Sequence, residues 1–215
     1  MKKRKYNLQF YFTVEGETES LYLNHFAKLI NKDENAKYTI SIVAKKKRPL
    51  SFAKSINNID PITVFHLNDF EGLNESFQKD FKNIFTEMSE AIKTRKIKKY
   101  HSGYSNLTFE LWLIIHKITL NRSFNYKEKY LPYLNKAFDE SFISMSEYKK
   151  EKNCRRLISK ITINDIKKAV QQAENIMKRN KENYQRLKYC GYQYYQQNPS
   201  LLINQPIKEI INKVY

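Results

Sequence analysis

The chain has 215 residues, a length that fits one domain or one domain with a sizeable appendage. Its 41% hydrophobic and 28% charged residues exclude wholesale disorder, and its 4 Gly and 5 Pro are too few for an all-β sandwich, so the composition favours long helices. Lys and Arg number 39 against 22 Asp and Glu, and the resulting net charge of +17 is more than solubility requires.

Three explanations of this positive charge are open on composition alone. A nucleic acid partner would account for it, because each Lys or Arg that neutralises a phosphate releases a counterion. The abundance of Lys, Asn, Ile and Tyr is also typical of AT-biased coding, which raises Lys content without a functional cause. An anionic membrane surface would attract the charge too, but no amphipathic anchor with Trp and Phe opposite Lys is found. We expect nucleic acid to be the partner.

The two cysteines, Cys154 and Cys190, lack the CxxC spacing of a metal or redox motif. Residues 6–14 are too short and too polar for the apolar region of a signal peptide. No run reaches the ~18 apolar residues of a membrane helix. We therefore expect a cytoplasmic protein with reduced thiols and no membrane partner.

The first half of the chain alternates predicted strands and helices. The strands are β-branched and aromatic runs, and the helices carry apolar residues at helical spacing. In chain order we expect a strand at 6–14, a helix at 17–32, a strand at 38–44, a short helix at 49–56, a strand at 62–67 and a long helix around 77–88, followed by a basic stretch at 93–99. Such alternation within about 90 residues is typical of a parallel sheet with right-handed crossovers.

The second half has a helical pattern. A short extended piece at 100–105 precedes a compact helix at 108–117 that carries the only Trp. Further helices are expected at 126–138, 144–160, 162–180 and 207–214. Because no sharp linker separates the halves, we predict an α/β core at residues 1–106 and a helical extension at 107–215, packed on the core as one compact unit.

Carboxylate and amide side chains follow the first and third predicted strands. Glu15 follows the first strand, and Asn68, Asp69 and Glu71 follow the third. The carboxyl ends of parallel strands share one edge of a sheet, so we expect these groups to line one rim together with the basic loop Lys45–Arg48. Carboxylate and amide oxygens suit Mg²⁺ or Mn²⁺, and this rim is a candidate metal site.

A simpler interpretation covers part of this pattern. Glu17 and Glu19 occupy the first turn of a helix, where the helix dipole favours negative charge. Asn68 or Asp69 is suited to cap the next helix. Glu15 precedes its helix, and neither explanation accounts for it.

Two other segments are ambiguous on spacing alone. Glu110 and His116 are six residues apart and do not form an i, i+4 ligand pair, and a His among Leu and Ile is more often a core residue. Residues 181–195 carry five Tyr among basic residues, which suits either base stacking or a packing face. The basic runs at 45–48 and 93–99 form a phosphate-tracking groove if they flank the acidic rim.

Several motifs resemble the RloB-like family. YFTVEGETESLYLNHF looks like its first motif, a strand followed by EGxTE and an aromatic-rich helix. VFHLNDF stands where the family carries a strand ending in DxD, and SNLTFELWLIIHK resembles its SNPxFExWLLLH segment. ITINDIKKAVQQAENI and Asn198-Pro199-Ser200 match its C-terminal pattern. The resemblance covers nearly the whole chain.

The resemblance implies a Toprim-like parallel sheet, the nuclease core shared with topoisomerases, primases and OLD-type nucleases. It also implies phage defence of the restriction or abortive-infection kind, often with an ABC-like ATPase partner. Glu15 would be the Toprim glutamate, and the aspartate pair would fall at His66 and Asn68. In the third motif, Glu110 and His116 match recurrent polar positions, and Leu107 replaces the usual Pro.

The chain departs from the family pattern where DxD has become HxN. The change removes two negative charges and weakens a site for a hard cation. Three outcomes are open: Asp69 and Glu71 shift in as ligands, one metal is held through Glu15 and Asp69, or the protein binds without catalysis.

These observations favour a Mg²⁺- or Mn²⁺-dependent nuclease that cleaves DNA or RNA, including tRNA. Its predicted catalytic residues are Glu15, Asp69, Glu110 and His116, and its predicted metal ligands are Glu15, Asn68, Asp69 and Glu71. The predicted nucleic-acid contacts are Lys45, Lys46, Lys47, Arg48, Lys96, Lys98 and Lys99. The alternative is a catalytically degenerate module that binds nucleic acid or the ATPase partner. Self-association of the chain is left open.

Overall fold

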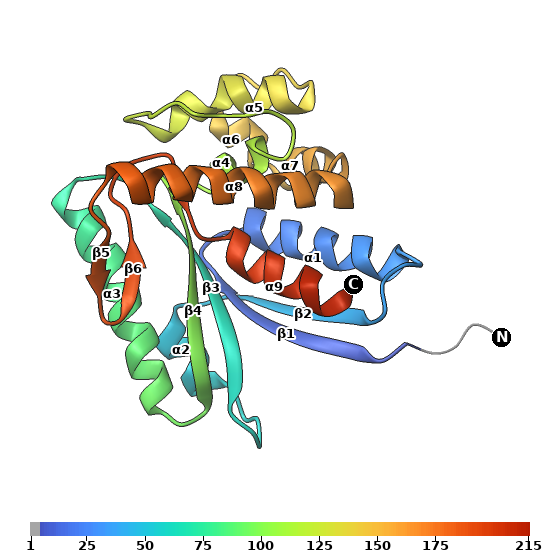
Figure 1. Ribbon diagram of the computed structural model, residues 1–215, viewed down its shortest axis with the longest axis vertical. Coiled ribbons are helices and arrows are strands. Elements are labelled where there is room, and N and C mark those ends of the chain that lie inside the picture. The colour runs from blue at the N-terminus through green and yellow to red at the C-terminus, as the bar shows by residue number, and fades with distance from the viewer. Residues whose placement is uncertain (1–4) are drawn as a thin grey trace.

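A five-stranded, mostly parallel sheet organises the computed structural model, which describes residues 5–215. The strand order is β2-β1-β3-β4-β7, and β7 alone is antiparallel. The strands are β1 (Asn7–Val14), β2 (Thr39–Lys46), β3 (Ile62–Phe70), β4 (Ile97–Asn106) and β7 (Ser200–Leu201). Figure 1 shows the sheet curling through the molecule. The predicted α/β class is confirmed.

Two hydrophobic cores lie on opposite faces of the sheet. Side chains alternate along β3, so Phe65 and Leu67 pack in the core that contains α1 (Glu17–Lys32), while Val64 and Phe70 pack in the core that contains α3 (Glu75–Lys93). The short helix α2 (Pro49–Ser55) joins the α3 face. This alternation also fixes the face of each polar residue near the end of β3.

The strands of the core extend further than the sequence pattern indicates. β3 continues through Phe70, so Asn68 and Asp69 lie inside the strand and do not cap the next helix. Asn74 caps α3 instead, accepting a hydrogen bond from the backbone N–H of Ser76. β4 begins at Ile97, within the predicted basic stretch, because exposed Lys98 and Lys99 lie between buried Ile97 and Tyr100.

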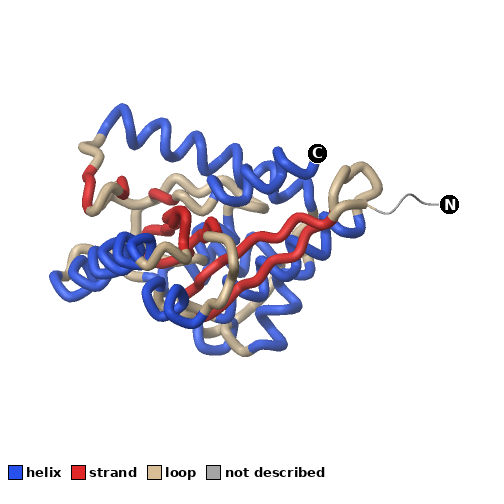
Figure 2. The backbone as a smooth tube through the Cα atoms, turned by 90° about the horizontal axis from the view of Figure 1, so that it is seen from below, coloured by secondary structure: helices blue, strands red, loops and turns tan. Residues whose placement is uncertain are grey.

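The second half is mainly helical, as expected. Its elements are α4 (Glu110–Ile114), the 3₁₀ turn η1 (Lys127–Tyr130), α5 (Leu131–Phe138), α6 (Met145–Tyr148), α7 (Glu151–Ser159), α8 (Ile163–Asn183) and α9 (Asn204–Val214). A hairpin of β5 (Leu187–Tyr189) and β6 (Tyr192–Tyr194) was not expected, and Gly191 makes its turn with φ +85°. The tube in Figure 2 shows the long α8 leading into this hairpin.

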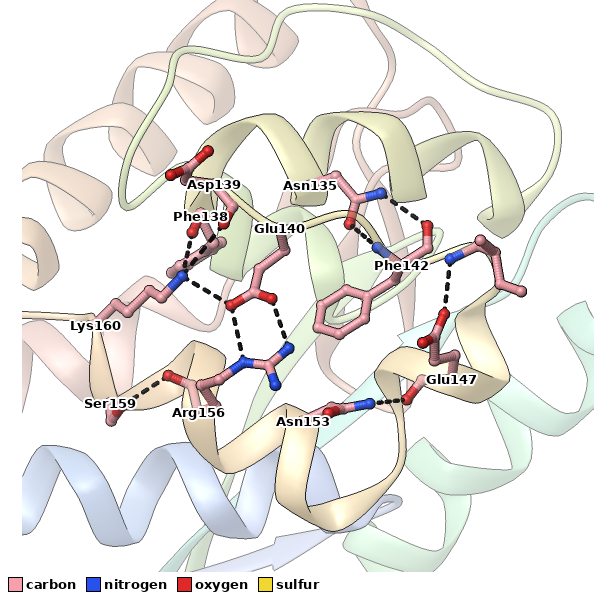
Figure 3. Close-up of polar contacts among 11 residues, drawn as sticks. Asn135, Phe138, Asp139, Glu140, Phe142, Glu147, Asn153, Arg156, Ser159 and Lys160 are labelled. Atoms are coloured by element: carbon pink, nitrogen blue, oxygen red, sulfur yellow. Dashed lines mark hydrogen bonds and ion pairs between the residues drawn. The ribbon is translucent and has the colours of Figure 1, made fainter.

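A polar cluster braces α5 against α7 (Figure 3). The Glu140 carboxylate accepts hydrogen bonds from Arg156 Nη2 at 2.6 Å and from Lys160 Nζ at 2.8 Å. Lys160 Nζ also donates to the backbone carbonyl of Phe138 at 2.6 Å. Because these contacts close the C-terminal end of α5 onto α7, we assign the cluster a structural role.

Among residues 5–215, no helix is both long enough and apolar enough to cross a membrane. Cys154 is buried and Cys190 is exposed, and both are free thiols.

Candidate active site

The ends of β1 and β3 bring Glu15 and Asp69 into contact. Val14 pairs with Leu67 in the parallel register, so Glu15 emerges beside the last residues of β3. The backbone N–H of Asp69 donates to Glu15 Oε2 at 3.1 Å. The juxtaposition expected from strand order therefore exists at the carboxyl edge of the sheet.

Four more carboxylates, those of Glu17, Glu19, Glu71 and Glu110, line a cavity of about 350 Å³ with this pair. The Glu17 side chain is largely exposed and lies 3.7 Å from Lys46 Nζ, so we leave it out of the group named next. We call Glu15, Glu19, Asp69, Glu71 and Glu110 the acidic recess. Lys149, next to α6, also lines it and supplies a positive charge. Asp80 of α3 and Arg48 border the side of the recess nearer α3.

Glu19 reaches the recess because Gly16 leaves room for its side chain. A Cβ atom at Gly16 would lie 2.6 Å from Glu19 Oε2. Glu19 is buried in the structure. Its place in the first helical turn had also allowed the simpler interpretation that it interacts with the helix dipole. Sequence reasoning gave Glu19 an assisting role beside Glu15 and Asp69 but did not count it among the predicted metal ligands. Its spacing of four residues from Glu15, across the glycine, is the signal that identifies it.

Glu110 enters the recess from α4, well separated in sequence from Glu15. Its side chain is 1% exposed. Thr108 Oγ1 donates to Glu110 Oε2, and Lys149 Nζ lies 3.5 Å from Glu110 Oε1. Lys149 is a further recess residue that sequence reasoning missed, because only tertiary packing brings it to α4.

Burial raises the pKa of three of the recess carboxyl groups, and neighbouring carboxylates add to the rise. Burial raises the pKa of Glu15 to about 7, and the neighbouring Glu71 adds to the rise. Burial also raises the pKa of Glu19 to about 7, with Glu110 and Glu15 contributing. Burial, Glu19 and Glu15 raise the pKa of Asp69 well above its usual value. Glu15 is exposed as a residue and keeps contact with water, which moderates its rise.

This donor set fits a hard divalent cation. All five groups offer carboxylate oxygens, the ligands that Mg²⁺ and Mn²⁺ prefer, and a cation would relieve their repulsion. Within the described part of the chain, no three Asp, Glu, His or Cys side chains already stand close enough together to enclose a metal ion. Cation binding at the recess therefore requires the carboxylates to rotate inward.

The predicted ligands divide between two faces of the sheet. Glu15, Asp69 and Glu71 line the recess, where Glu71 also pairs with Lys127 at 3.2 Å. Asn68 shares the face of Val64 and Phe70, toward α3, so its amide points away from the side of Asp69. Sequence order places Asn68 beside Asp69, but the strand separates them.

His66 is a buried, neutral histidine on the α3 face. Its Nδ1 lies 2.8 Å from Thr13 Oγ1, which is in turn 2.9 Å from the hydroxyl of Tyr100. Burial, reinforced by the charge of Arg48, lowers the pKa of His66 to about 3. His66 therefore does not reproduce the charge of an aspartate at this position.

The structure does not bring His116 to the recess. Its Nδ1 donates to the carbonyl of Trp112 at 2.7 Å, and its Nε2 lies 3.1 Å from the Tyr22 hydroxyl. Burial lowers the pKa of His116 to about 4. Both ring nitrogens are thus occupied in the core, in line with the simpler interpretation of a lone His among apolar residues.

The predicted basic contacts lie at two opposite edges. Lys46, Lys47 and Arg48 line a cavity of about 260 Å³ next to Glu15, and Lys45 precedes them at the end of β2. Lys96, Lys98 and Lys99 lie at the start of β4, whereas Asp69 pairs with Ser105 near the end of that strand. These three lysines therefore do not flank the acidic recess.

The Tyr-rich segment at 181–195 is partly core. Tyr192 stacks on Phe85 of α3 with ring centroids 5.0 Å apart, and Tyr194 packs edge-on against Phe81. Tyr184 and Tyr189 are exposed. The packing interpretation holds for the first two residues, and stacking on bases stays a prediction for the exposed pair.

Fold and site together define a class: an α/β protein whose parallel sheet gathers carboxylates at its carboxyl edge, beside a cavity lined by Lys46, Lys47 and Arg48. The chain belongs to the family described as RloB-like protein, whose model matches residues 10–210. No curated protein and no solved structure matches the chain.

Proposed function

We propose that the protein is a Toprim-like nuclease that hydrolyses nucleic acid phosphodiesters with Mg²⁺ or Mn²⁺. The observation that carries the proposal is the meeting of Glu15 and Asp69, together with Glu19 and Glu110, in one cavity at the carboxyl edge of the sheet. Carboxyl groups such as Glu15, Glu19 and Asp69, whose pKa is raised by burial and by neighbouring carboxylates, are typical of catalytic sites. The net charge of +17 supports a polyanionic substrate.

In this mechanism the residues of the recess would hold the cation, and the neighbouring basic residues would bind the substrate. Glu15 and Asp69 would hold the cation, and Glu71, Glu19 and Glu110 would complete its oxygen environment. When bound, the cation supplies polarisation of the phosphodiester and activation of water. Lys45–Arg48 would hold the nucleic acid backbone beside the recess, and Lys149 would limit repulsion between Glu110 and the incoming phosphate.

Phage defence in the cytoplasm, with an ABC-like ATPase partner and with DNA or RNA as substrate, completes the proposal. Membership of the RloB-like family supports it. We retain the division into a core at 1–106 and a helical extension at 107–215 as part of the proposal.

Two conservative variants test the nuclease. Glu15→Gln and Asp69→Asn remove one charge each while keeping size and shape. We expect each variant to lose at least about 100-fold of the Mn²⁺-dependent cleavage of plasmid, single-stranded DNA or tRNA. Glu90→Gln makes the same change at an exposed position of α3 and serves as the matched control. Unchanged cleavage in both recess variants would refute the proposal.

A second candidate function is binding without catalysis. It is favoured by the neutral His66 and by the orientation of Asn68, which together leave the DxD position without charge. This module would bind nucleic acid with steep salt dependence and show no metal-dependent turnover. Calorimetry with Mn²⁺ separates the two, because micromolar binding that is lost in a Glu15/Asp69 double variant supports the enzyme.

A further inference from the structure

The cavity beside Glu15 on the α3 face is lined mainly by groups that donate hydrogen bonds. It has a volume of about 260 Å³, and we call it the basic pocket. Its lining residues are Val14, Glu15, Lys46, Lys47, Arg48, His66 and Ile84. His66 forms part of the wall although it is only 1% exposed. The pocket therefore combines exposed cations with one buried side chain.

The Nε2 atom of His66 is buried and has no hydrogen-bond partner within residues 5–215. A buried polar atom without a partner costs about 1–3 kcal/mol, so its presence calls for an explanation. The ring is held at its other nitrogen by Thr13, which is itself bonded to Tyr100. These contacts fix the ring while leaving Nε2 unused.

The same contacts can all be satisfied with the proton of His66 on Nε2. Tyr100 is buried, and in the described structure its hydroxyl has one hydrogen-bond partner, Thr13 Oγ1. When Tyr100 donates to Thr13, the Thr13 hydroxyl is left to donate to His66 Nδ1. A neutral histidine has one protonated nitrogen, so in this arrangement Nε2 carries the hydrogen and is a donor.

The neighbouring cations strengthen this donor set. Lys47 Nζ pairs with no acceptor in the part of the chain that the structure describes, and Lys46 lies 3.7 Å from Glu17. Arg48 Nε bonds Glu87 at 2.6 Å, which leaves its terminal nitrogens for another acceptor. Glu15 is the acidic group among the lining residues, and the three cations outnumber it. Several charged and neutral donors converging on one pocket suit an oxyanion, and the Arg guanidinium suits phosphate in particular.

We infer that the basic pocket binds a backbone phosphate of the nucleic acid next to the scissile one, with His66 Nε2–H, Lys47 and Arg48 as donors. The identity of the ligand rests on the proposed function, whereas the preference for an oxyanion rests on the pocket itself. Where the resemblance places the first aspartate of DxD, this chain has converted a negative position into a donor for phosphate. The departure from the family motif is then a change of role and not a loss.

Two variants of His66 separate its two nitrogens. His66→Asn keeps an amide near the Nδ1 position, for Thr13, and lacks the Nε2 donor. His66→Gln places an amide N–H₂ near the Nε2 position. The probe is a short single-stranded oligonucleotide in EDTA, so neither metal binding nor cleavage contributes. We expect about tenfold weaker binding for His66→Asn and for Lys47→Ala, and near wild-type binding for His66→Gln.

A third variant introduces repulsion. His66→Asp restores the charge of the family motif, and we expect it to bind the oligonucleotide more weakly than His66→Asn does. Thermal unfolding checks that each variant folds. If His66→Asn does not fold, nitrogen-detected NMR of the wild-type protein still tests the idea, because the chain has only 4 histidines. We expect His66 to be protonated at Nε2 and its Nε2 signal to shift on addition of the oligonucleotide.

The outcomes distinguish this inference from the proposed nuclease. Oligonucleotide binding that is equally tight in wild type, His66→Asn and His66→Asp would overturn it, as would a proton on Nδ1. Inorganic phosphate that shifts His66 without competition from the oligonucleotide would assign the pocket to free phosphate and overturn the backbone assignment. Weaker binding by His66→Asn supports the inference even if Glu15→Gln has no effect on cleavage.

Discussion

The backbone N–H of Asp69 donates a hydrogen bond to the carboxylate of Glu15 at 3.1 Å. This contact joins the ends of two adjacent parallel strands and holds the Glu15 carboxylate beside the acid of Asp69. One amide donor does not compensate several buried carboxylates, and the pKa of Glu15 stays raised to about 7, mainly by burial. A cation bound in the recess would relieve this unfavourable burial of carboxylates.

Mn²⁺ should stabilise the folded protein through the recess. A cation that binds only the folded state adds about 2.7 kcal/mol at a concentration 100 times its Kd, which raises Tm by several degrees. Asp69→Asn should abolish this rise, and Glu90→Gln should retain it. Differential scanning fluorimetry with and without Mn²⁺ measures both. An equal rise in the Asp69→Asn variant would place the cation elsewhere.

Metal-free protein should lose stability as pH rises from about 4.5 to 7. Burial and the charge of Glu110 raise the pKa of Glu19 to about 7, so the folded state retains a proton that the unfolded state has released. Stability from a raised carboxyl pKa is present below the unfolded value and is lost as pH rises through the folded value. Glu19→Gln cannot ionise and should flatten this dependence.

Urea unfolding in EDTA at several pH values compares wild type with Glu19→Gln. The difference between the two proteins isolates Glu19 from the other titrating groups. A steeper loss of stability in the variant than in the wild type would contradict the assigned direction.

Glu140, in the α5–α7 cluster, should make stability depend on pH in the opposite direction. Hydrogen bonds from Arg156, followed by those from Lys160, lower the pKa of Glu140. Its stabilisation is present above the ordinary carboxyl pKa and is lost as pH falls through the lowered value. Because Arg156 is half in water, we expect Glu140→Gln to lower Tm at pH 7 by only about 2–4 °C. Cleavage should be unaffected, and the Tm difference should vanish in acid.

Local sequence patterns predicted the parts of the fold whose signals are local. The EGETE segment ends a strand and starts a helix, and α1 begins and ends within the predicted range because Gly16 and the periodic apolar residues mark it. Strand alternation predicted that Glu15 and Asp69 share an edge. The sequence analysis began β4 too late because exposed Lys98 and Lys99 resemble a solvated basic run. The strand nevertheless includes them, since Ile97 and Tyr100 on either side are buried.

The rest of the site depends on long-range packing. Glu110 and Lys149 meet Glu19 only after α4 and α6 fold over α1, and no spacing rule connects such distant residues. Asn68 was predicted beside Asp69 because the strand was expected to stop before it, and the extra residues of β3 turn the two side chains to opposite faces. For His116 the local pattern was the better guide. Its spacing among apolar residues indicated a core position, which the structure has, whereas the family resemblance suggested a catalytic role that its packing does not support.

Gly16→Ala should weaken cation binding without unfolding the protein. The backbone at Gly16 has φ −123°, which alanine adopts readily, so the new Cβ acts mainly by displacing the Glu19 carboxylate, whose Oε2 would lie 2.6 Å away. We expect Mn²⁺ affinity measured by calorimetry to fall by about tenfold, as for the loss of an interaction that orients a ligand. Gly191→Ala is the matched control: within residues 5–215 its Cβ meets nothing closer than 4 Å, but its φ of +85° strains the hairpin turn. The control should lower Tm and leave Mn²⁺ affinity unchanged, and the same loss of affinity in both variants would show that Glu19 is not the group through which Gly16 acts.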